Sequence, residues 1–335
     1  MQTTNLIQQF NQRQKRADSR FILLLVGFLL VIMLFALSAG EIWLWPTSWS
    51  SDAAQLFVWN IRLPRVLAVI VVGAGLAVTG AVMQALFENP LAEPGLLGIS
   101  NGAGVAVVFI VLLYHGIAPY WLLSLGAIAG ALLLTFILLF FARRKHFSNT
   151  SLLLVGVGLG VICGAIMTWM VYLSSSLDLR QLLYWMMGSF SGIDWRQSWM
   201  LIASIPCLLG LILQGRVLNY LSLGDIQSYQ LGVSSYYWRL ILIVMSGILI
   251  GLSVAIAGAI SFVGLVVPHL LRLAGLTDNR MLLPACALAG AAGLLLADIL
   301  SRLLLSNAEI PIGVITATLG VPLFIGLLIR NNHWR

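Results

Sequence analysis

The stretch from Leu240 to Leu271, "LILIVMSGILIGLSVAIAGAISFVGLVVPHLL", runs for 32 residues without an Asp, Glu, Lys or Arg. A helix needs about 20 apolar residues to cross a bilayer, so the stretch is too long for one ordinary crossing and short for two. If it crosses twice, one of its helices must be short or broken. Gly258, Gly264 and Pro268 are the residues able to break it, where protein covers the freed backbone groups.

The composition of the whole chain indicates a membrane protein. Of its 335 residues, 60% are hydrophobic and 9% are charged, with a mean hydropathy of +1.01, whereas a soluble domain carries about 25% charged residues. Basic residues flank the apolar runs, so the net charge of +7 does not indicate nucleic-acid binding. The other uncharged runs are Phe21–Gly40, Val66–Phe87, Pro94–Ala142, Phe147–Leu177, Gln197–Gly215, Met281–Ala297 and Ile310–Ile329.

One of these runs contains two helices, and a polar segment precedes the first run. Pro94–Ala142 is about twice the length of one crossing and divides at "YHGIAPY", Tyr114–Tyr120, into two predicted helices. Residues 1–20 are polar and basic, and the run that follows them is long enough to span, so they are not a cleavable signal. We expect these twenty residues to be a cytoplasmic segment.

The positive-inside rule decides how often Leu240–Leu271 crosses. With one crossing, 10 of the 18 basic residues lie inside and 8 lie outside, which gives no clear orientation. With two crossings, five lie outside, namely Arg62, Arg65, Arg180, Arg196 and Arg302. The rest lie inside, namely Arg13, Lys15, Arg16, Arg20, Arg143, Arg144, Lys145, Arg216, Arg239, Arg272, Arg280, Arg330 and Arg335. The sequence therefore predicts an all-α polytopic protein, a single transmembrane domain over residues 1–335 with about ten helices and both termini cytoplasmic.

A weak internal repeat supports a transporter. "GLAVTGAVMQALFENPLAEP", from Gly75, is similar to "GLSVAIAGAISFVGLVVPHLLR", from Gly251, and each reaches a proline after a Gly-Ala step. In the ten-helix arrangement the first unit runs inward and the second begins outward. Inverted halves of this kind are a common transporter construction.

The predicted spans contain few residues that could act as catalytic or ion-binding groups. Glu88, Glu93 and Asp298 lie near predicted helix ends, and we find no HExxH motif and no paired carboxylates inside a span. "GISNGAG", Gly98–Gly104, lacks the Gly-Lys-Ser/Thr ending of a phosphate loop and is better explained as helix packing through small residues. If ATP drives this protein, another subunit must bind the nucleotide.

Two connections on the cytoplasmic side are unusual. Residues 214–237 form the longest internal polar segment, in which "SLGDIQSYQLG" predicts a short helix capped by Ser222 and ended by Gly232. This segment is either a bland surface loop or a docking element for a cytoplasmic subunit. "FENPLAEPG", Phe87–Gly95, is predicted to be a tight turn. In a transporter the same turn would also narrow a pathway.

Long blocks of the sequence resemble the permeases of the iron-siderophore and cobalamin (FecCD-type) ABC importer family. The blocks are "FVWNIRLPRVLAVIVVGAGLAVTGAVMQALFENPLAEPGLLGISNGAGV", "DLRQLLYWMMGSFSGIDWRQSW", "GAISFVGLVVPHLLRLAGLTDNRMLLPACALAGAAGLLLADILSR" and "AEIPIGVITATLGVPLF". Within the family, "RQLLYWMMG" and "DWRQSW" are most similar to cobalamin permeases, with ferric-siderophore or heme permeases as the alternative. An ion-coupled secondary transporter is a more distant alternative.

The resemblance implies a homodimer in the bacterial inner membrane, surrounded by lipid, with no enzymatic activity and no cofactor in this chain. Two cytoplasmic ATPase subunits would bind ATP and Mg, and one periplasmic binding protein would deliver the substrate. ATP hydrolysis in the partners would drive alternating access.

The resemblance also implies roles for single residues. Arg62, Arg65 and Arg302 would dock the binding protein, because the guanidinium fork pairs with carboxylates. The cytoplasmic gate would contain Asn89, Leu91, Asn149 and Thr150. Coupling to the ATPase would involve Leu223, Gly224, Asp225, Ile226, Gln230, Leu231 and Gly232, within the 214–237 loop.

Overall fold

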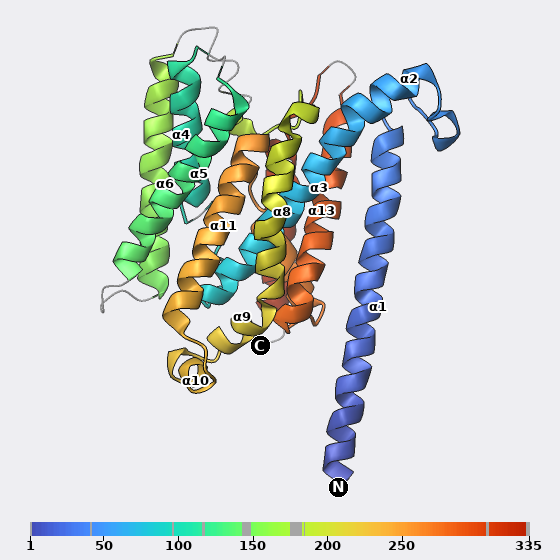
Figure 1. Ribbon diagram of the computed structural model, residues 1–335. Coiled ribbons are helices and arrows are strands. Elements are labelled where there is room, and N and C mark those ends of the chain that lie inside the picture. Colours follow the sequence, from blue (N-terminus) through green and yellow to red (C-terminus); the bar gives the residue numbers. More distant parts are fainter. Residues whose placement is uncertain are drawn as a thin grey trace.

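The computed structural model describes residues 2–332 apart from 41, 96, 116–117, 143–148, 175–182, 184 and 306–307. Every regular element within these ranges is a helix (Figure 1). The longer helices are α1 (Gln2–Ser38), α3 (Leu63–Leu86), α4 (Ile99–Leu113), α5 (Tyr120–Ala142), α6 (Asn149–Tyr172), α8 (Ser198–Leu213), α11 (Ser235–Ala257), α12 (Val263–Leu273), α13 (Asn279–Leu303) and α14 (Ile312–Asn332). The shorter ones are η1 (Pro46–Ser48), α2 (Asp52–Ala54), η2 (Gln55–Arg62), η3 (Trp195–Gln197), α9 (Gly215–Leu221) and α10 (Asp225–Gln230).

Within the described residues the structure has ten apolar helices, the number that the sequence predicts. Seven are long and apolar enough to cross a membrane, and three shorter apolar helices begin at Ile99, Val263 and Ile312. The division of Pro94–Ala142 into α4 and α5 is confirmed. Five basic residues used in the charge count lie outside the described residues: Arg143, Arg144, Lys145, Arg180 and Arg335.

The stretch Leu240–Leu271 forms two helices, as predicted, and the second is short. Helix α11 ends at Ala257, where Gly258 has a φ of 70°, and α12 spans only 11 residues. Gly264 and Pro268 lie inside α12, so of the three predicted breakers only Gly258 interrupts the helix. The freed backbone groups are covered by protein, because Ser189 N–H donates to the Ala257 carbonyl at 2.9 Å.

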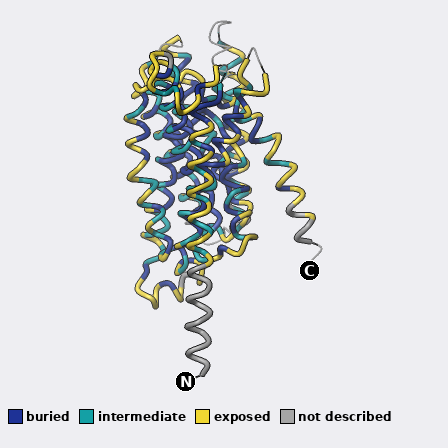
Figure 2. Tube along the Cα trace, turned by 90° about the vertical axis from the view of Figure 1, so that its right-hand side faces the viewer, coloured by how far each residue is buried: buried dark blue, intermediate teal, exposed yellow. Residues whose placement is uncertain are grey.

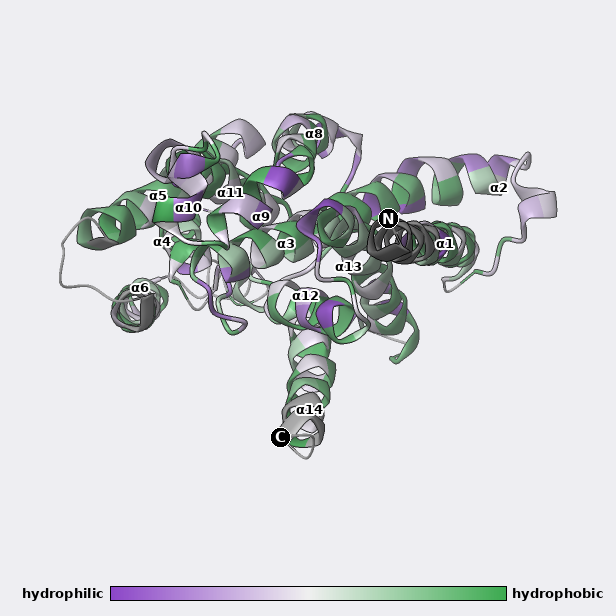
Figure 3. Ribbon diagram, turned by 90° about the horizontal axis from the view of Figure 1, so that it is seen from below, coloured by the Kyte–Doolittle hydropathy of each residue, from purple (hydrophilic) through white to green (hydrophobic). Residues whose placement is uncertain are grey.

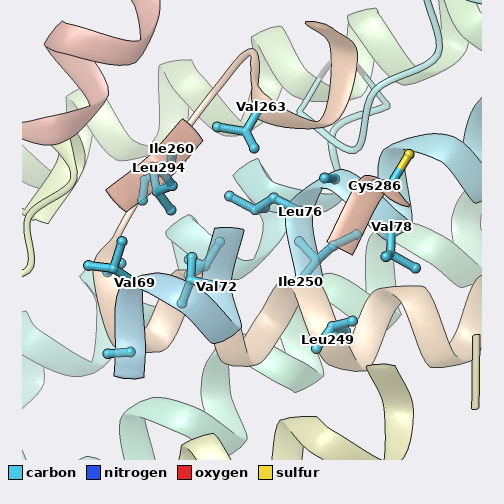
Figure 4. Close-up of a cluster of buried hydrophobic side chains, with 14 of the residues drawn as sticks. Val69, Val72, Leu76, Val78, Leu249, Ile250, Ile260, Val263, Cys286 and Leu294 are labelled. Atoms are coloured by element: carbon cyan, nitrogen blue, oxygen red, sulfur yellow. The ribbon is translucent and has the colours of Figure 1, made fainter. Parts of the chain in front are cut away.

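Helix α3 is the centre of the bundle. In the helical segment Gln55–Leu86, 83% of the most apolar 18 residues are buried. Helix α3 packs against α11, α12 and α13. The core residues that α3 contributes, Val69, Val72 and Leu76 among them, lie beside Ile250 of α11 and Leu294 of α13 (Figure 4). Small residues let the helices approach closely. A Cβ added to Gly102 of α4 would lie 2.6 Å from the Gly130 carbonyl oxygen of α5, which confirms the packing role of "GISNGAG".

The α3 helix begins earlier than the apolar run predicts. The π-helix η2 leads directly into it, so that Arg62 and Arg65 lie within a continuous helical segment rather than before one. Pro64 occupies the first turn of α3, where a missing N–H is tolerated. A π-helical turn is rare and is frequently found at functional sites.

The helices of the bundle connect two opposite ends of the molecule. The α10 end carries α9 and α10, and the opposite end, the arginine end, carries the start of α3 and the end of α13 (Figure 1). Helix α3 runs from the arginine end toward the α10 end, whereas α11 runs the other way. The two units of the predicted inverted repeat therefore lie on oppositely directed helices.

Helices α6 and α14 lie at the periphery. Of the most apolar 18 residues of α6, only 17% are buried. Helix α14 stands away from the other helices when the bundle is viewed along its axis (Figure 3). Buried residues gather in the middle of the bundle, whereas exposed ones cover the outer helices (Figure 2). Both peripheral helices therefore present apolar side chains that the rest of this chain does not cover.

Candidate functional site

The three predicted docking arginines come together at the arginine end. Arg62 ends η2, Arg65 lies in the first turn of α3, and Arg302 lies in the last turn of α13. The side chains of all three are largely buried, because the side chains of Arg65 and Arg302 are only 9% exposed and Arg62 as a residue is 7% exposed. The charge pattern predicts that they face outward, and in the structure each is already held by groups of this chain.

Arg62 caps the end of α1. Its Nη1 donates to the carbonyls of Leu37 and Ser38, both at 2.9 Å, and its Nη2 donates to the Ile42 carbonyl at 2.6 Å. The last carbonyls of a helix have no partner within the helix and carry partial negative charge, so a guanidinium suits them. Arg62 therefore ties the α1 corner to the start of α3.

Arg65 and Arg302 share a buried carboxylate, Asp298. Arg65 Nη2 lies 2.9 Å from Asp298 Oδ1, and Arg302 Nε lies 3.1 Å from Asp298 Oδ2. Arg65 also pairs in two hydrogen bonds with Glu309, at 2.8 and 3.0 Å. Arg65 and Arg302 thus meet two carboxylates, and Arg62 beside them is held by carbonyls, so the cluster of three guanidinium groups and two carboxylates has one excess positive charge. Arg302 Nη2 is buried and has no hydrogen-bond partner within the described residues.

The arginines line a cavity of about 1060 Å³ at this end. Aromatic side chains share its wall, Phe57, Tyr120 and Trp185 among them, and Glu309 lies at it as well. The arrangement can hold an acidic group against the excess positive charge. Among the described residues no group of three His, Cys, Asp or Glu side chains could hold a metal ion.

The predicted gate residues lie between α3 and α4 and at the start of α6. Asn89 Oδ1 accepts the Leu91 N–H at 2.8 Å, which closes a tight turn, and the Leu91 side chain is exposed. Asn149 and Thr150 begin α6, and their side chains lie outside the described part of the structure. The α3–α4 connection packs on α6, because a Cβ added to Gly156 would lie 2.9 Å from Leu97 Cα.

Glu93, in the same connection, is a buried carboxylate that joins it to α12. Its Oε1 accepts the N–H of Phe262 at 2.7 Å, and Phe262, with a φ of 70°, is the residue before α12. Burial raises the pKa of Glu93 to about 7, although the hydrogen bond from Phe262 acts in the opposite direction. The connection is therefore fixed to the break between α11 and α12.

At the α10 end, the predicted short helix is confirmed as α10. Gly232, with a φ of 81°, ends it as predicted. The prediction that Ser222 caps it is wrong. The Ser222 hydroxyl donates instead to the Leu218 carbonyl at 2.9 Å, within the end of α9, and Gly224 precedes α10. Ser222 forms the bond to Leu218 because Ser222 is the residue that ends α9, whereas the residue directly before α10 is Gly224.

Exposed apolar side chains surround α10. Within and beside the predicted coupling segment, the most exposed are Leu223 (54%), Ile226 (76%), Tyr229 (77%), Leu231 (55%), Tyr236 (53%) and Tyr237 (66%). We call this set the α10 patch. A large contiguous apolar patch on a surface marks a contact with another protein or with a membrane. Gly224, Gln230 and Gly232 of the predicted set lie in the same segment, and nothing is described of the Asp225 side chain.

Asp298 and Glu309 were not predicted from the sequence as partners of the arginines. Asp298 is placed near a helix end by its position in the run, yet it is fully buried. Its spacing of four from Arg302 was the available signal for that pair. No local pattern connects Arg65 with either carboxylate, because both lie more than 230 residues away.

Comparison with known proteins gives one consistent result. The FecCD transport family model matches residues 22–330. The Vitamin B12 import system permease protein BtuC of Photorhabdus laumondii is 63% identical over 334 residues, covering 100% of both chains. The same-named protein of Yersinia enterocolitica is 62% identical and covers 98% of each chain. A solved structure described as an inward-facing metal-chelate type ABC transporter is 30% identical, with a TM-score of 0.85 over 93% of this chain and 99% of that one.

Proposed function

This chain belongs to the FecCD transport family and is a permease subunit of an ABC importer, and we propose that its cargo is vitamin B12 (cobalamin). One observation carries the proposal: relatives named vitamin B12 import permeases are more than 60% identical to it over nearly their whole length. The second candidate cargo is a metal chelate such as a ferric siderophore or heme. The solved structure favours this candidate, but at 30% identity.

The permease works with an ATPase and a substrate-binding protein, and we propose two copies of the ATPase on the cytoplasmic side. The α10 patch supports this site. Its exposed apolar side chains, Ile226 and Tyr229 foremost, are of the kind that a partner's groove buries. ATP and Mg would bind to the ATPase, and this chain would hold no cofactor. The α10 end and both termini would face the cytoplasm of a bacterium, with the bundle in the inner membrane.

We propose that the binding protein docks at the arginine end. The excess positive charge of the cluster supports this proposal, because a carboxylate of the partner would neutralise it. The internal contacts qualify how docking would occur. Each arginine would keep some present acceptors and exchange others for the partner's carboxylates, since all three guanidinium groups are engaged within this chain.

We propose a homodimer formed through the peripheral helices, with the pathway between the copies. Helix α6 exposes Leu154, Val161 and Trp169, and α14 exposes Leu319 and Ile325. Lipid would cover the remaining apolar surface. In alternating access, ATP binding and hydrolysis would move α10, and the gate near Asn89 and Leu91 would open as the opposite end closes.

The test is transport by the complete complex. The chain is reconstituted in vesicles with its ATPase and its binding protein, and ATP-dependent uptake of labelled cobalamin is measured. Uptake of a ferric siderophore without cobalamin would move the cargo to the second candidate. Uptake under an imposed proton or sodium gradient without ATP would support a secondary transporter instead, and no flux of any cargo would contradict the transport role.

A further inference from the structure

Helix α9 connects the α10 patch with the start of α13. Its first residue, Gly215, lies against the backbone of α13, because a Cβ added there would be 2.7 Å from Arg280 Cα and 2.8 Å from the Asn279 carbonyl oxygen. Leu218 and Leu221 of α9 are buried in the core. The two helices therefore touch without an intervening side chain.

The Asn219 side chain binds the first residues of α13 with both ends of its amide. Its Nδ2 donates to Asp278 Oδ1 at 2.6 Å. Its Oδ1 accepts the Asn279 backbone N–H at 3.0 Å and the Asn279 side-chain amide at 2.9 Å. The first N–H groups of a helix have no partner within it, so Asn219 supplies, from another helix, part of the cap of α13.

Asp278 completes that cap. It accepts the Arg280 N–H at 2.9 Å and pairs with the Arg280 guanidinium. Burial would raise the pKa of Asp278, but hydrogen bonds from Arg280 and Asn219 outweigh burial and lower it to about 2. Asp278 is therefore a carboxylate at neutral pH and a constant acceptor for Asn219.

Helix α10 is attached to α9 at the residue next to Asn219. The buried Ser228 hydroxyl lies 2.7 Å from the Tyr220 carbonyl and 2.6 Å from the Gly224 carbonyl. Ser228 also accepts the Val233 N–H through its own carbonyl at 2.9 Å, which fixes the end of α10. A displacement of α10 thus acts on Tyr220, and through it on Asn219.

Helix α13 reaches the other end of the bundle. Its 25 residues extend about 37 Å at 1.5 Å per residue. Near its end it carries Asp298 and Arg302, the two residues that organise the arginine cluster. A contiguous path of packed and hydrogen-bonded groups therefore leads from α10 through Asn219 to the arginine end, the kind of path that carries coupling between distant sites.

We infer that Asn219 is a positioning residue that transmits movement of α10 to α13, and so couples the ATPase face to the arginine end. The inference rests on the proposed function, because it assigns α10 to the ATPase. It goes beyond that function in naming the joint and its two partners, Asp278 and Asn279.

An exchange of the two polar groups tests the joint in the assembled complex. Asn219→Asp alone sets two carboxylates 2.6 Å apart in the wild-type geometry and breaks the contact. The double change Asn219→Asp with Asp278→Asn reverses the donor and the acceptor of this contact and keeps an acceptor for the Asn279 N–H. Asp278→Asn alone measures the loss of the Asp278–Arg280 contacts, which the exchange does not restore. Ser222→Ala is the matched control, since among the described residues the Ser222 hydroxyl donates to Leu218 of α9 and contacts neither α10 nor α13.

The first readout is hydrogen exchange over residues 290–303 of α13, with and without ATP, which requires no cargo. We expect an ATP-dependent change in the wild type and in Ser222→Ala, its loss in Asn219→Asp, and its return in the double change. The second readout is cobalamin transported per ATP hydrolysed, which we expect to fall about fivefold or more in Asn219→Asp. A wild-type ATP response of α13 that persists in Asn219→Asp overturns the inference.

The two readouts separate the inference from the proposed function. A merely structural role would lower assembly and ATP hydrolysis together, whereas a positioning role lowers the cargo transported per ATP in a complex that still assembles and hydrolyses ATP. If the wild type shows the ATP response in α13 but transports no cobalamin, the proposed cargo fails while the joint stands. If the double change fails to rescue either readout in a folded, assembled complex, the joint is wrong.

Discussion

Gly80 of α3 and Gly264 of α12 meet backbone to backbone, with no room between them for a methyl group. Beside this contact, the Gln84 side-chain amide lies 3.3 Å from the Leu265 carbonyl of α12. A helix of 11 residues cannot cross a bilayer by itself. Close packing against α3 is what lets this short helix exist within the bundle, since protein rather than lipid surrounds its start.

Gly80→Ala is expected to destabilise the protein. An added Cβ overlaps the Gly264 backbone, which cannot move aside as a flexible side chain would, so overpacking should cost about 1–3 kcal/mol. Gly293→Ala on α13 is the control, because its added Cβ meets nothing within 4 Å. There alanine should stabilise by up to about 1 kcal/mol through helix propensity. Unfolding measured in detergent compares the two, and equal effects would show that the glycine contact carries no packing constraint.

Asp298→Ala is expected to be among the most damaging single changes. It leaves two guanidinium groups at the arginine end without their shared, fully buried carboxylate, and breaking a buried pair from one side costs about 3–5 kcal/mol. Asp194→Ala, which removes a helix cap and an exposed pair with Arg196, should cost only about 1 kcal/mol. If Asp298→Ala lowers the free energy of unfolding no more than Asp194→Ala does, the contacts of Asp298 with Arg65 and Arg302 do not stabilise the fold as expected.

These residues also show where prediction from sequence stopped. The number of helices and the break in Leu240–Leu271 follow from local properties, namely run length, charge and the conformation that Gly258 adopts. The contact of Arg65 with Asp298 joins residues 233 apart, and nothing near either residue specifies it. Ser222 failed as a cap because two local hydrogen bonds compete and the sequence does not rank them. Nothing given by the structure tests the docking, gate and coupling roles, which stay predictions.

The stability contributed by Glu93 is expected to fall as the pH rises. Its pKa in the folded protein, about 7, exceeds the ordinary 4.5, so between these values the folded chain holds a proton that the unfolded chain has lost. That contribution is full below about pH 4.5 and is lost as the pH rises through about 7. Melting temperatures from about pH 5 to 8 should therefore fall less in Glu93→Gln than in the wild type. Glu88→Gln, an exposed neighbour, is the control, and identical pH profiles in all three proteins would contradict the assignment.

Ile226→Asp and Tyr229→Asp are expected to weaken assembly with the ATPase without unfolding the permease. Both side chains are more than 75% exposed, so a charge there meets water in the free chain and would be desolvated only in the complex. Trp45→Asp, at the arginine end and 65% exposed, is the control. Co-purification of the ATPase measures assembly and thermal unfolding measures the fold. Full assembly of both variants would exclude the α10 patch as the contact.

Glu309→Gln is expected to tighten binding of the substrate-binding protein. Glu309 occupies both terminal nitrogens of Arg65 and is the more exposed of the two carboxylates, at 38% against 0% for Asp298. A carboxylate of the partner must compete for those nitrogens, and removing the charge of Glu309 lowers the cost of exchange. An exposed ion pair contributes about 0.2–1 kcal/mol, so the dissociation constant should fall by up to about fivefold. Asp194→Asn, at the same end but outside the cluster, should leave it unchanged. Weaker binding by Glu309→Gln would instead mean that Glu309 itself contacts the partner.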